Sequence, residues 1–451
     1  STQGVSSAAS DVYKRQVVIP GPWNEAVSFL MDVADGTCYR VDTEHDMLTD
    51  TELRTHEALV KAADGREIKS FVDDKVFRLI KKKDATVRTM DCIWVRKWKR
   101  RPTSTDLGEV KSRLVVRGFL DPQKKHVSRY SSTATRLSQR LLVSLAVENH
   151  FDLEQWDIGN AFLKGFSFDV MRQMCQKFGI TVPDVERTVT ITVPDNVWHH
   201  LTDLEFFNDW ISNIHLYALE LLKAMYGLVD APVLWSIALR YLIIHLLKGR
   251  PSRYDEHFLY WTSTDHRGLQ TLEAASTIHV DDLVVAARRS WLEKAYARFL
   301  AKLGKVKRQQ LPFTNVIMEY ARLSDGGILL SQVKYAEALK PVTISGSEAQ
   351  PTQPLDAAGV TKLRGVIGAV LCLCLTRWDL LFDLIALQTQ VTNATGHALK
   401  DCNAIITRAK RHKSLGLRFH PLPGSERRLA AIADSSHARK KSSYAFEGNL
   451  V

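Results

Sequence analysis

Two adjacent aspartates, Asp281 and Asp282, stand between two apolar runs in the segment 276–287, which reads Ser-Thr-Ile-His-Val-Asp-Asp-Leu-Val-Val-Ala-Ala. Apolar and β-branched runs separated by two residues predict two short strands joined by a tight turn, with both carboxylates at the tip. Neighbouring carboxylates repel each other, so the pair needs either open solvent or a cation. Because Asp is also a common turn residue for local reasons, the hairpin alone leaves both interpretations open.

The composition favours a multidomain protein that binds a polyanion. A chain of 451 residues is longer than one hydrophobic core supports, which predicts about two to four domains. With 45% hydrophobic and 25% charged residues, the composition excludes a disordered chain. Sixty-one Lys and Arg against 50 Asp and Glu give a net charge of +11, which is typical of proteins that bind nucleic acid.

The cysteines and the apolar runs indicate the cellular environment. The six cysteines are scattered and form no Cys-x-x-Cys pair, so we expect reduced, buried thiols in an intracellular protein. The most apolar uncharged run, Gly365–Leu375, is much shorter than the roughly 20 residues that span a bilayer. The sequence therefore predicts no membrane segment.

The first part of the chain predicts a leader followed by helices. Residues 1–16 lack the apolar core of a signal peptide and any periodicity, so we expect a non-native or disordered leader on a fragment of a longer protein. Thr49 and Glu52 have the spacing of a capping box, which predicts a helix start. Gly65 is a stop signal, and a second short helix is expected over 68–72. We assign 17–66 to an N-terminal helical segment.

A basic and aromatic stretch follows. Residues 93–99 and 113–116 alternate as strands do and predict a cationic hairpin. The run Lys81–Lys83 is equally compatible with a solvated face. Interleaved Trp and Arg on strands are more specific, because such surfaces stack on bases and follow a phosphate backbone. Lys111 and Arg113 are therefore candidate triphosphate ligands.

A third acid follows a predicted helix over 137–148. Asp157 ends a short strand, where a lone Asp is most often a cap or turn former. Combined with the hairpin, it fits nucleotidyl transfer, which uses two divalent ions roughly 3.5 to 4 Å apart. Carboxylates are the ligands that Mg²⁺ prefers, and phosphate and water complete its coordination.

Four motifs occur in a fixed order: Lys111–Phe119, Asp157–Gly165, Leu222–Trp235 and His279–Leu283. In this order and spacing they resemble the reverse transcriptase of copia-type LTR retrotransposons, a part of the pol polyprotein. The resemblance runs from about residue 67 to the C-terminus.

The resemblance implies an α+β right-hand polymerase. Fingers and palm are expected over 67–290, thumb and connection over 291–425, and a truncated start of a ribonuclease H domain over 426–451. Residues 291–303, which are amphipathic and basic, are expected to form a thumb helix along the duplex. Asp434 takes the place of the first ribonuclease H acid, but too little chain follows it to predict that activity.

The resemblance also implies roles at the site. Asp157 and Asp281 are expected to bind two Mg²⁺ or Mn²⁺ ions, with Asp282 as a supporting acid and third candidate ligand. Tyr226 and Gly227 are expected to shape the template or nucleotide pocket. Phe162, which the residues alone would equally place in the core, becomes a steric gate against the ribose 2′-hydroxyl.

Three residues depart from the family pattern. His279 replaces a Tyr, Trp378 replaces a Pro, and Asp230 replaces a Gln of the nucleotide pocket, where its charge is expected to repel a triphosphate. Two functions follow: an RNA-directed DNA polymerase that uses an RNA template, a DNA primer and deoxynucleoside triphosphates, or a decayed copy that still folds and binds nucleic acid. An unrelated basic protein is disfavoured by the four ordered motifs. We expect an intracellular location, in a cytoplasmic particle or the nucleus, and leave the oligomeric state open.

Overall fold

The computed structural model describes residues 28–32, 37–41, 47–103, 105–129, 131–177, 186–206, 213–422, 432–436 and 446–450. The expected leader 1–16 lies outside these residues. Strands β1 (Ser28–Asp32) and β2 (Thr37–Val41) pair with each other, as do β18 (Ile432–Ser436) and β19 (Phe446–Leu450). The expected helical segment 17–66 therefore contains a strand pair as well as helices.

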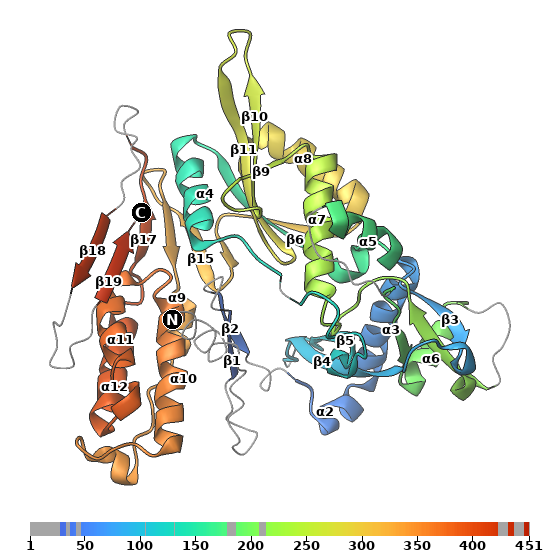
Figure 1. Cartoon of the computed structure of the whole chain (residues 1–451), viewed down its shortest axis with the longest axis horizontal. Helices are drawn as coiled ribbons and strands as arrows, with labels where there is room; N and C mark the ends of the chain where they lie inside the picture. The colour runs from blue at the N-terminus through green and yellow to red at the C-terminus, as the bar shows by residue number, and fades with distance from the viewer. Residues whose placement is uncertain are drawn as a thin grey trace, which may run out of the picture.

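The largest sheet has six antiparallel strands in the order β13-β6-β12-β11-β10-β9. Figure 1 shows it in the upper part of the molecule, with the β10–β11 hairpin projecting at the top. Its strands are β6 (Asp152–Ile158), β9 (Arg250–Pro251), β10 (Phe258–Thr264), β11 (Gln270–His279), β12 (Asp282–Ala287) and β13 (Val306–Gln310). The hairpin expected around the paired aspartates is thus confirmed as β11–β12.

Helices bury both faces of this sheet. On β12, Leu283 and Val285 face one hydrophobic cluster, and Val284 faces another. The first cluster includes α7 (Ala231–Leu246) and α8 (Arg289–Leu303), and the second includes α4 (Arg136–Glu148). A strand buried on both faces needs apolar residues at consecutive positions, which explains the unbroken apolar run of β12.

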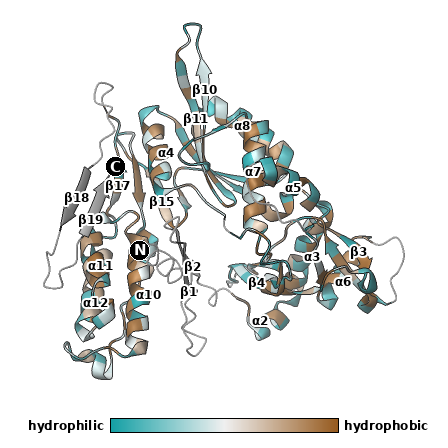
Figure 2. Cartoon of the chain, viewed as in Figure 1, coloured by the Kyte–Doolittle hydropathy of each residue, from teal (hydrophilic) through white to brown (hydrophobic). Residues whose placement is uncertain are grey.

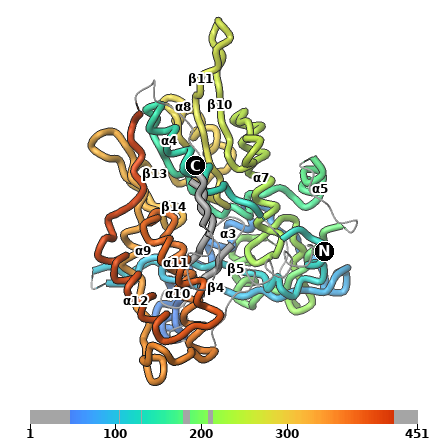
Figure 3. Tube along the Cα trace, turned by 60° about the vertical axis from the view of Figure 1, so that its left-hand side comes forward, coloured from blue at the N-terminus to red at the C-terminus, as the bar shows by residue number. Residues whose placement is uncertain are grey.

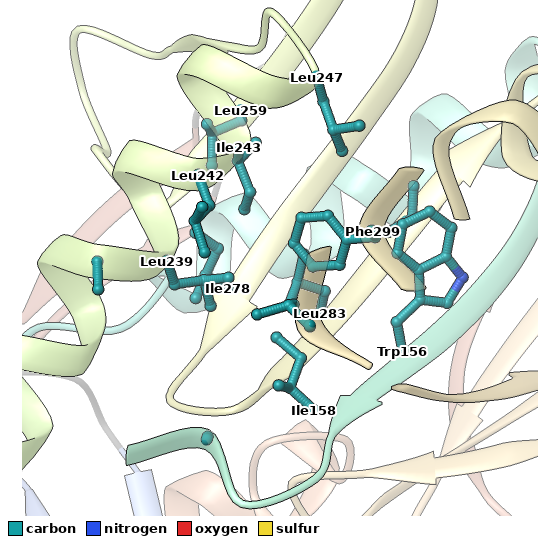
Figure 4. Packing of buried hydrophobic residues seen from close by; sticks show 14 of the residues in the cluster. Trp156, Ile158, Leu239, Leu242, Ile243, Leu247, Leu259, Ile278, Leu283 and Phe299 are labelled. Carbon is teal, nitrogen blue, oxygen red and sulfur yellow. The ribbon is translucent and has the colours of Figure 1, made fainter. Parts of the chain in front are cut away.

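Helix α8 belongs to the core under this sheet. Phe299 lies beside Leu283 and Trp156, as Figure 4 shows, and all three side chains are buried. The amphipathic helix expected over 291–303 is thus present within α8 and packs on the six-stranded sheet, whereas its role as a thumb helix stays a prediction. Its apolar stripe packs on the sheet, and its exposed residues include the basic Lys294, Arg298 and Lys302 together with Glu293 and Leu300.

A second sheet has five strands in the order β3-β8-β7-β4-β5. The strands are β3 (Phe77–Lys81), β4 (Met90–Arg100), β5 (Glu109–Val116), β7 (Thr190–Thr192) and β8 (Tyr217–Leu221). Helices α2 (Asp50–Thr55), α3 (Glu57–Asp73) and α6 (Asp195–Asp203) belong to the same group. The antiparallel pair β4–β5 confirms the expected cationic hairpin.

The capping box of Thr49 and Glu52 is confirmed at the start of α2. The predicted stop at Gly65 is wrong, because α3 continues through it to Asp73. Ile68 and Phe71 on the second half of α3 are completely buried, and this packing outweighs the low helix propensity of one glycine.

A third group combines a four-stranded sheet with helices. The sheet has the order β14 (Phe313–Asn315), β15 (Met318–Arg322), β16 (Ile328–Ser331) and β17 (Gly416–Phe419). The helices are α9 (Val333–Ala338), α10 (Ala357–Leu373), α11 (Leu381–Gln388) and α12 (Gly396–Arg411). The apolar residues of α10 and α11 are coloured brown in Figure 2, and Figure 3 shows these helices away from the β10–β11 hairpin.

The remaining elements are short. They are α5 (Phe168–Lys177) and the 3₁₀ turns η1 (Lys82–Asp84), η2 (Gly118–Leu120), η3 (Ala161–Lys164), η4 (Ile214–Leu216), η5 (Gly346–Ala349), η6 (Trp378–Leu380) and η7 (Val391–Asn393). The expected α+β class is confirmed. Within the described part of the chain, every helix is too short or too polar to cross a bilayer.

The expectation of six reduced thiols is wrong for Cys372, which is disulfide-bonded. The free thiols among the described side chains, Cys92, Cys175, Cys374 and Cys402, are buried as expected.

Candidate active site

The sheet brings the three aspartates together. Asp282 opens β12 and lies directly opposite Asp157 on β6. Asp281 lies in the preceding turn, and its carbonyl oxygen accepts a hydrogen bond from the Ile158 amide at 3.2 Å. The expected convergence of these acids is therefore confirmed. The expected tip is displaced by one residue, because His279 pairs with Asp282 and leaves Val280 and Asp281 as the turn.

Asp157 and Asp282 share one face of the sheet. Directly opposed residues in antiparallel strands project to the same side, as do residues two apart. Gln155 therefore lies on this face as well, and its Nε2 donates to the Asp282 carboxylate at 3.0 Å. Lys307 on β13 is the partner of Asp157 on the other side. A polar stripe thus crosses three strands at the end of an otherwise apolar surface.

The carboxylates are held close enough to perturb one another. Burial raises the pKa of Asp281, and the nearby charge of Asp157 raises it further. Burial raises the pKa of Asp282 to about 7, with additional contributions from Asp281 and Asp157. Buried like charges of this kind are stabilised by a dication.

Among the described residues, no group of three His, Cys, Asp or Glu side chains is arranged to hold a metal ion. The expectation that Asp157, Asp281 and Asp282 are metal ligands therefore stays a prediction. Asp157 and Asp281 still fit Mg²⁺, which accepts one or two carboxylates and completes its shell with water and phosphate.

Cationic side chains of β5 face these acids. Burial lowers the pKa of the Lys111 ammonium and Arg113 lowers it further, whereas Asp157 and Asp281 oppose the shift. Arg113 Nη1 donates to Glu67 at 3.1 Å and to Asn160 at 3.0 Å. These contacts fix the guanidinium beside the carboxylates.

An aromatic pair completes this cluster. Phe162 on η3 packs edge-on against Tyr226, with ring centroids 5.3 Å apart, and the Arg113 guanidinium lies 4.4 Å from the Tyr226 ring centroid. Phe162 and Tyr226 are both half-buried. Gly227 has φ of +93°, and a Cβ there would lie 2.0 Å from the Val116 carbonyl oxygen. Only glycine fits this close approach of the loop to β5.

Asp230 does not belong to this cluster. Its side chain is buried, and both of its carboxylate oxygens accept hydrogen bonds from Arg187, at 2.8 and 3.0 Å. The same guanidinium binds Asp121 at 2.6 Å. The expectation that Asp230 lines the nucleotide pocket and repels a triphosphate is therefore wrong, because its charge is paired inside the protein.

The structure also describes the two other residues that depart from the family pattern, His279 and Trp378. His279 is buried, and burial lowers its pKa to about 4. Trp378 begins η6, where the Arg140 guanidinium lies 4.7 Å from its ring centroid. Asp434 lies on β18 opposite Gly448, and its side chain is outside the described residues.

Sequence reasoning missed four supporting residues: Glu67, Gln155, Asn160 and Arg187. Asn160 alone carried a signal, since it follows a glycine in a turn and adopts φ of +56°, a conformation in which Asn is enriched. Glu67 and Arg187 pair with residues far away in sequence, which no local pattern reveals.

Two curated proteins of Arabidopsis thaliana are similar to this chain, whereas no protein-family profile matches it. The retrovirus-related Pol polyprotein from transposon RE2 is 24% identical over 334 residues, which cover 71% of this chain and 20% of that protein. The polyprotein from transposon RE1 is 23% identical over 396 residues, which cover 84% of this chain and 24% of that protein. The chain thus spans about a fifth to a quarter of these relatives.

Solved structures of telomerase also align. Apo telomerase from Candida tropicalis has a TM-score of 0.36 at 10% identity, covering 78% of this chain and 67% of that one. Telomerase from Candida albicans, in complex with a fragment of telomeric RNA, has a TM-score of 0.33 at 8% identity, covering 78% and 66%. TM-scores this low do not establish a common fold.

The sequence relatives match the resemblance expected from the four motifs. The chain is a relative of one segment of the retrovirus-related Pol polyproteins of transposons.

Proposed function

We propose that this chain is the reverse transcriptase segment of a copia-type retrotransposon, an RNA-directed DNA polymerase that extends a DNA primer on an RNA template. The observation that carries the proposal is the approach of Asp157 to the Asp281–Asp282 turn across β6 and β12. These carboxylates come from segments more than a hundred residues apart and face Lys111, a cation suited to phosphate.

In this proposal Asp157 and Asp281 hold two Mg²⁺ or Mn²⁺ ions. The ions supply activation of the attacking hydroxyl and stabilisation of the leaving oxygen. Asp282 is a supporting acid, which Gln155 holds by a hydrogen bond. It lies beside the ligands and is not itself required in the coordination shell.

Lys111 and Arg113 bind the triphosphate of the incoming nucleotide. Glu67, Asn160 and Tyr226 hold the Arg113 guanidinium in one orientation, which leaves its other N–H groups able to donate to phosphate oxygens. Ordering the guanidinium in advance reduces the entropy lost on nucleotide binding.

Phe162 and Tyr226 form the wall under the sugar. A ring at Phe162 excludes the 2′-hydroxyl of a ribonucleotide while accepting deoxyribose. Template and primer bind through phosphate contacts, which the net charge of +11 favours.

The second candidate is a decayed copy that retains only the fold and nucleic-acid binding. One argument for it was the negative charge of Asp230 near the triphosphate. The pairing of Asp230 with Arg187 removes that argument, so the decayed copy rests on His279 and Trp378.

The first prediction tests polymerisation directly. With an RNA template, a DNA primer, deoxynucleotides and Mg²⁺ or Mn²⁺, the chain should extend the primer. Asp281→Asn should reduce extension at least roughly a hundredfold, because a preorganised group that stabilises the transition state is removed. Exposed Asp203→Asn is the matched control and should retain the rate. Full extension by Asp281→Asn would show that catalysis occurs elsewhere.

The second prediction concerns sugar discrimination. Phe162→Val should allow ribonucleotide incorporation and lower stability by roughly 1 to 4 kcal/mol, because Phe162 also packs against two hydrophobic clusters. Phe166→Val is the matched control, since Phe166 is similarly half-buried but packs on Tyr241. Incorporation assays and thermal melts separate the effects. If both variants lose stability and neither incorporates ribonucleotides, Phe162 is not a gate.

The third prediction concerns Asp230. Asp230→Asn should lower the free energy of unfolding by about 1 to 3 kcal/mol, because Arg187 loses one buried carboxylate while keeping Asp121. The Michaelis constant for nucleotide should stay unchanged. A lower Michaelis constant without lost stability would return Asp230 to the nucleotide pocket. Asp203→Asn again serves as the control, measured by thermal melting.

A further inference from the structure

We propose that a cavity lined by Lys164, Lys223 and Lys302 binds a compact, multiply charged phosphate anion such as inorganic diphosphate. The cavity has a volume of about 240 Å³. Its lining residues are Asp74, Lys164, Gly165, Phe166, Lys223, Leu242, Lys302 and Leu303. The inference goes beyond the proposed function and does not depend on polymerase activity.

The charges in this cavity are unequal. Three ammonium groups face one carboxylate, that of Asp74. Lys164 forms an ion pair with this carboxylate, and its Nζ lies 2.8 Å from Asp74 Oδ1. The side chains of Lys223 and Lys302 make no hydrogen bond or ion pair with any residue that the structure describes. Lys223 is half-buried and Lys302 is exposed at the solvent side of the cavity, so both ammonium groups are available to a ligand that enters from solvent.

The surroundings of Lys223 also favour the binding of an anion. Its side chain is half-buried, and burial lowers the pKa of the ammonium. Lys164 and Lys75 lower that pKa further by repulsion, and only Asp74 opposes them. An anion between the lysines compensates both the burial and the repulsion.

The shape of the cavity limits the size of the ligand. Its volume is below the roughly 300 to 1,000 Å³ typical of pockets for drug-sized molecules, which favours a small ion. Leu242, Leu303 and Phe166 supply apolar walls. Apolar walls reduce local screening, so charge-assisted hydrogen bonds from lysine to phosphate oxygens are stronger there than at an open surface.

The cavity is distinct from the candidate active site. None of Asp157, Asp281, Lys111 and Arg113 lines it. It nevertheless shares η3 with that site, since Lys164 lies two residues after Phe162. The phosphate could come from free diphosphate or from a phosphodiester of bound nucleic acid, and the experiment below separates these sources.

The test is calorimetric titration of the full chain with inorganic diphosphate in buffer containing EDTA, which prevents binding that requires a divalent ion. One saturable site is expected. Lys223→Gln and Lys302→Gln should each weaken binding roughly tenfold, which corresponds to about 1.4 kcal/mol. Lys294→Gln, an exposed change on α8, is the matched control and should bind as the wild type does. Thermal melts verify that each variant is folded.

Two results would overturn the proposal. The first is the absence of saturable binding to the folded wild type. The second is binding that Lys111→Gln abolishes and Lys223→Gln retains, which would assign it to the triphosphate site. If a short single-stranded DNA displaces the bound diphosphate from the wild type, the result supports the lysine site with a nucleic-acid phosphodiester as one source of the phosphate; if the DNA does not displace it, the result supports the site with free diphosphate as its ligand. Because no metal ion or primer is present, each result is independent of primer extension.

Discussion

The pairing of β6 with β12 is the constraint on which the candidate site depends. It sets Asp157 opposite Asp282 and ties the Asp281 carbonyl to the Ile158 amide. Carboxylates buried together raise one another's pKa and oppose folding, so the sheet must compensate for their repulsion. It does so through apolar residues on both faces of β12, which bury against α7 and α8 on one side and α4 on the other.

The cations around the acids come from a different unit. Lys111 and Arg113 lie on β5 of the five-stranded sheet, and Arg113 is bound both by Glu67 from α3 and by Asn160 beyond β6. The site is therefore a junction between two sheets, and the Arg113–Asn160 hydrogen bond crosses it. Arg187 forms a second set of buried ion pairs, which joins Asp121 after η2 to Asp230 at the start of α7. Arg113 and Arg187 both form ion pairs. Among the described residues, the carboxylates of Asp157, Asp281 and Asp282 form none.

The sequence predicted the parts of the site that depend on local patterns. The acidic hairpin, the β4–β5 pair, the helix 137–148 and the capping box of Thr49 all follow from short-range periodicity or turn chemistry, and all are present. The sequence also predicted that Asp157 lies close to Asp281 and Asp282, because nucleotidyl transfer with two divalent ions requires these carboxylates together. The role of Lys111 was predicted from its basic strand, whereas the roles of Phe162 and Tyr226 came from a family resemblance. The structure adds the contact between Phe162 and Tyr226.

The errors share one physical cause, which is tertiary contact. Gly65 does not stop α3, because the buried Phe71 holds the helix beyond it. Asp230 was expected to repel a triphosphate in the nucleotide pocket, but its carboxylate is paired with Arg187, which is distant in sequence. No pattern within a short window contains these partners.

The claim that Asp157 and Asp281 form a divalent-metal site can be measured without catalysis. Mn²⁺ binding to the chain, with primer, RNA template and a non-hydrolysable deoxynucleotide analogue bound, is detectable by electron paramagnetic resonance. The account predicts that Asp157→Asn and Asp281→Asn each weaken Mn²⁺ binding strongly, while Asp203→Asn has no effect. Unchanged binding in both folded variants would contradict it and would place the metal elsewhere in the protein.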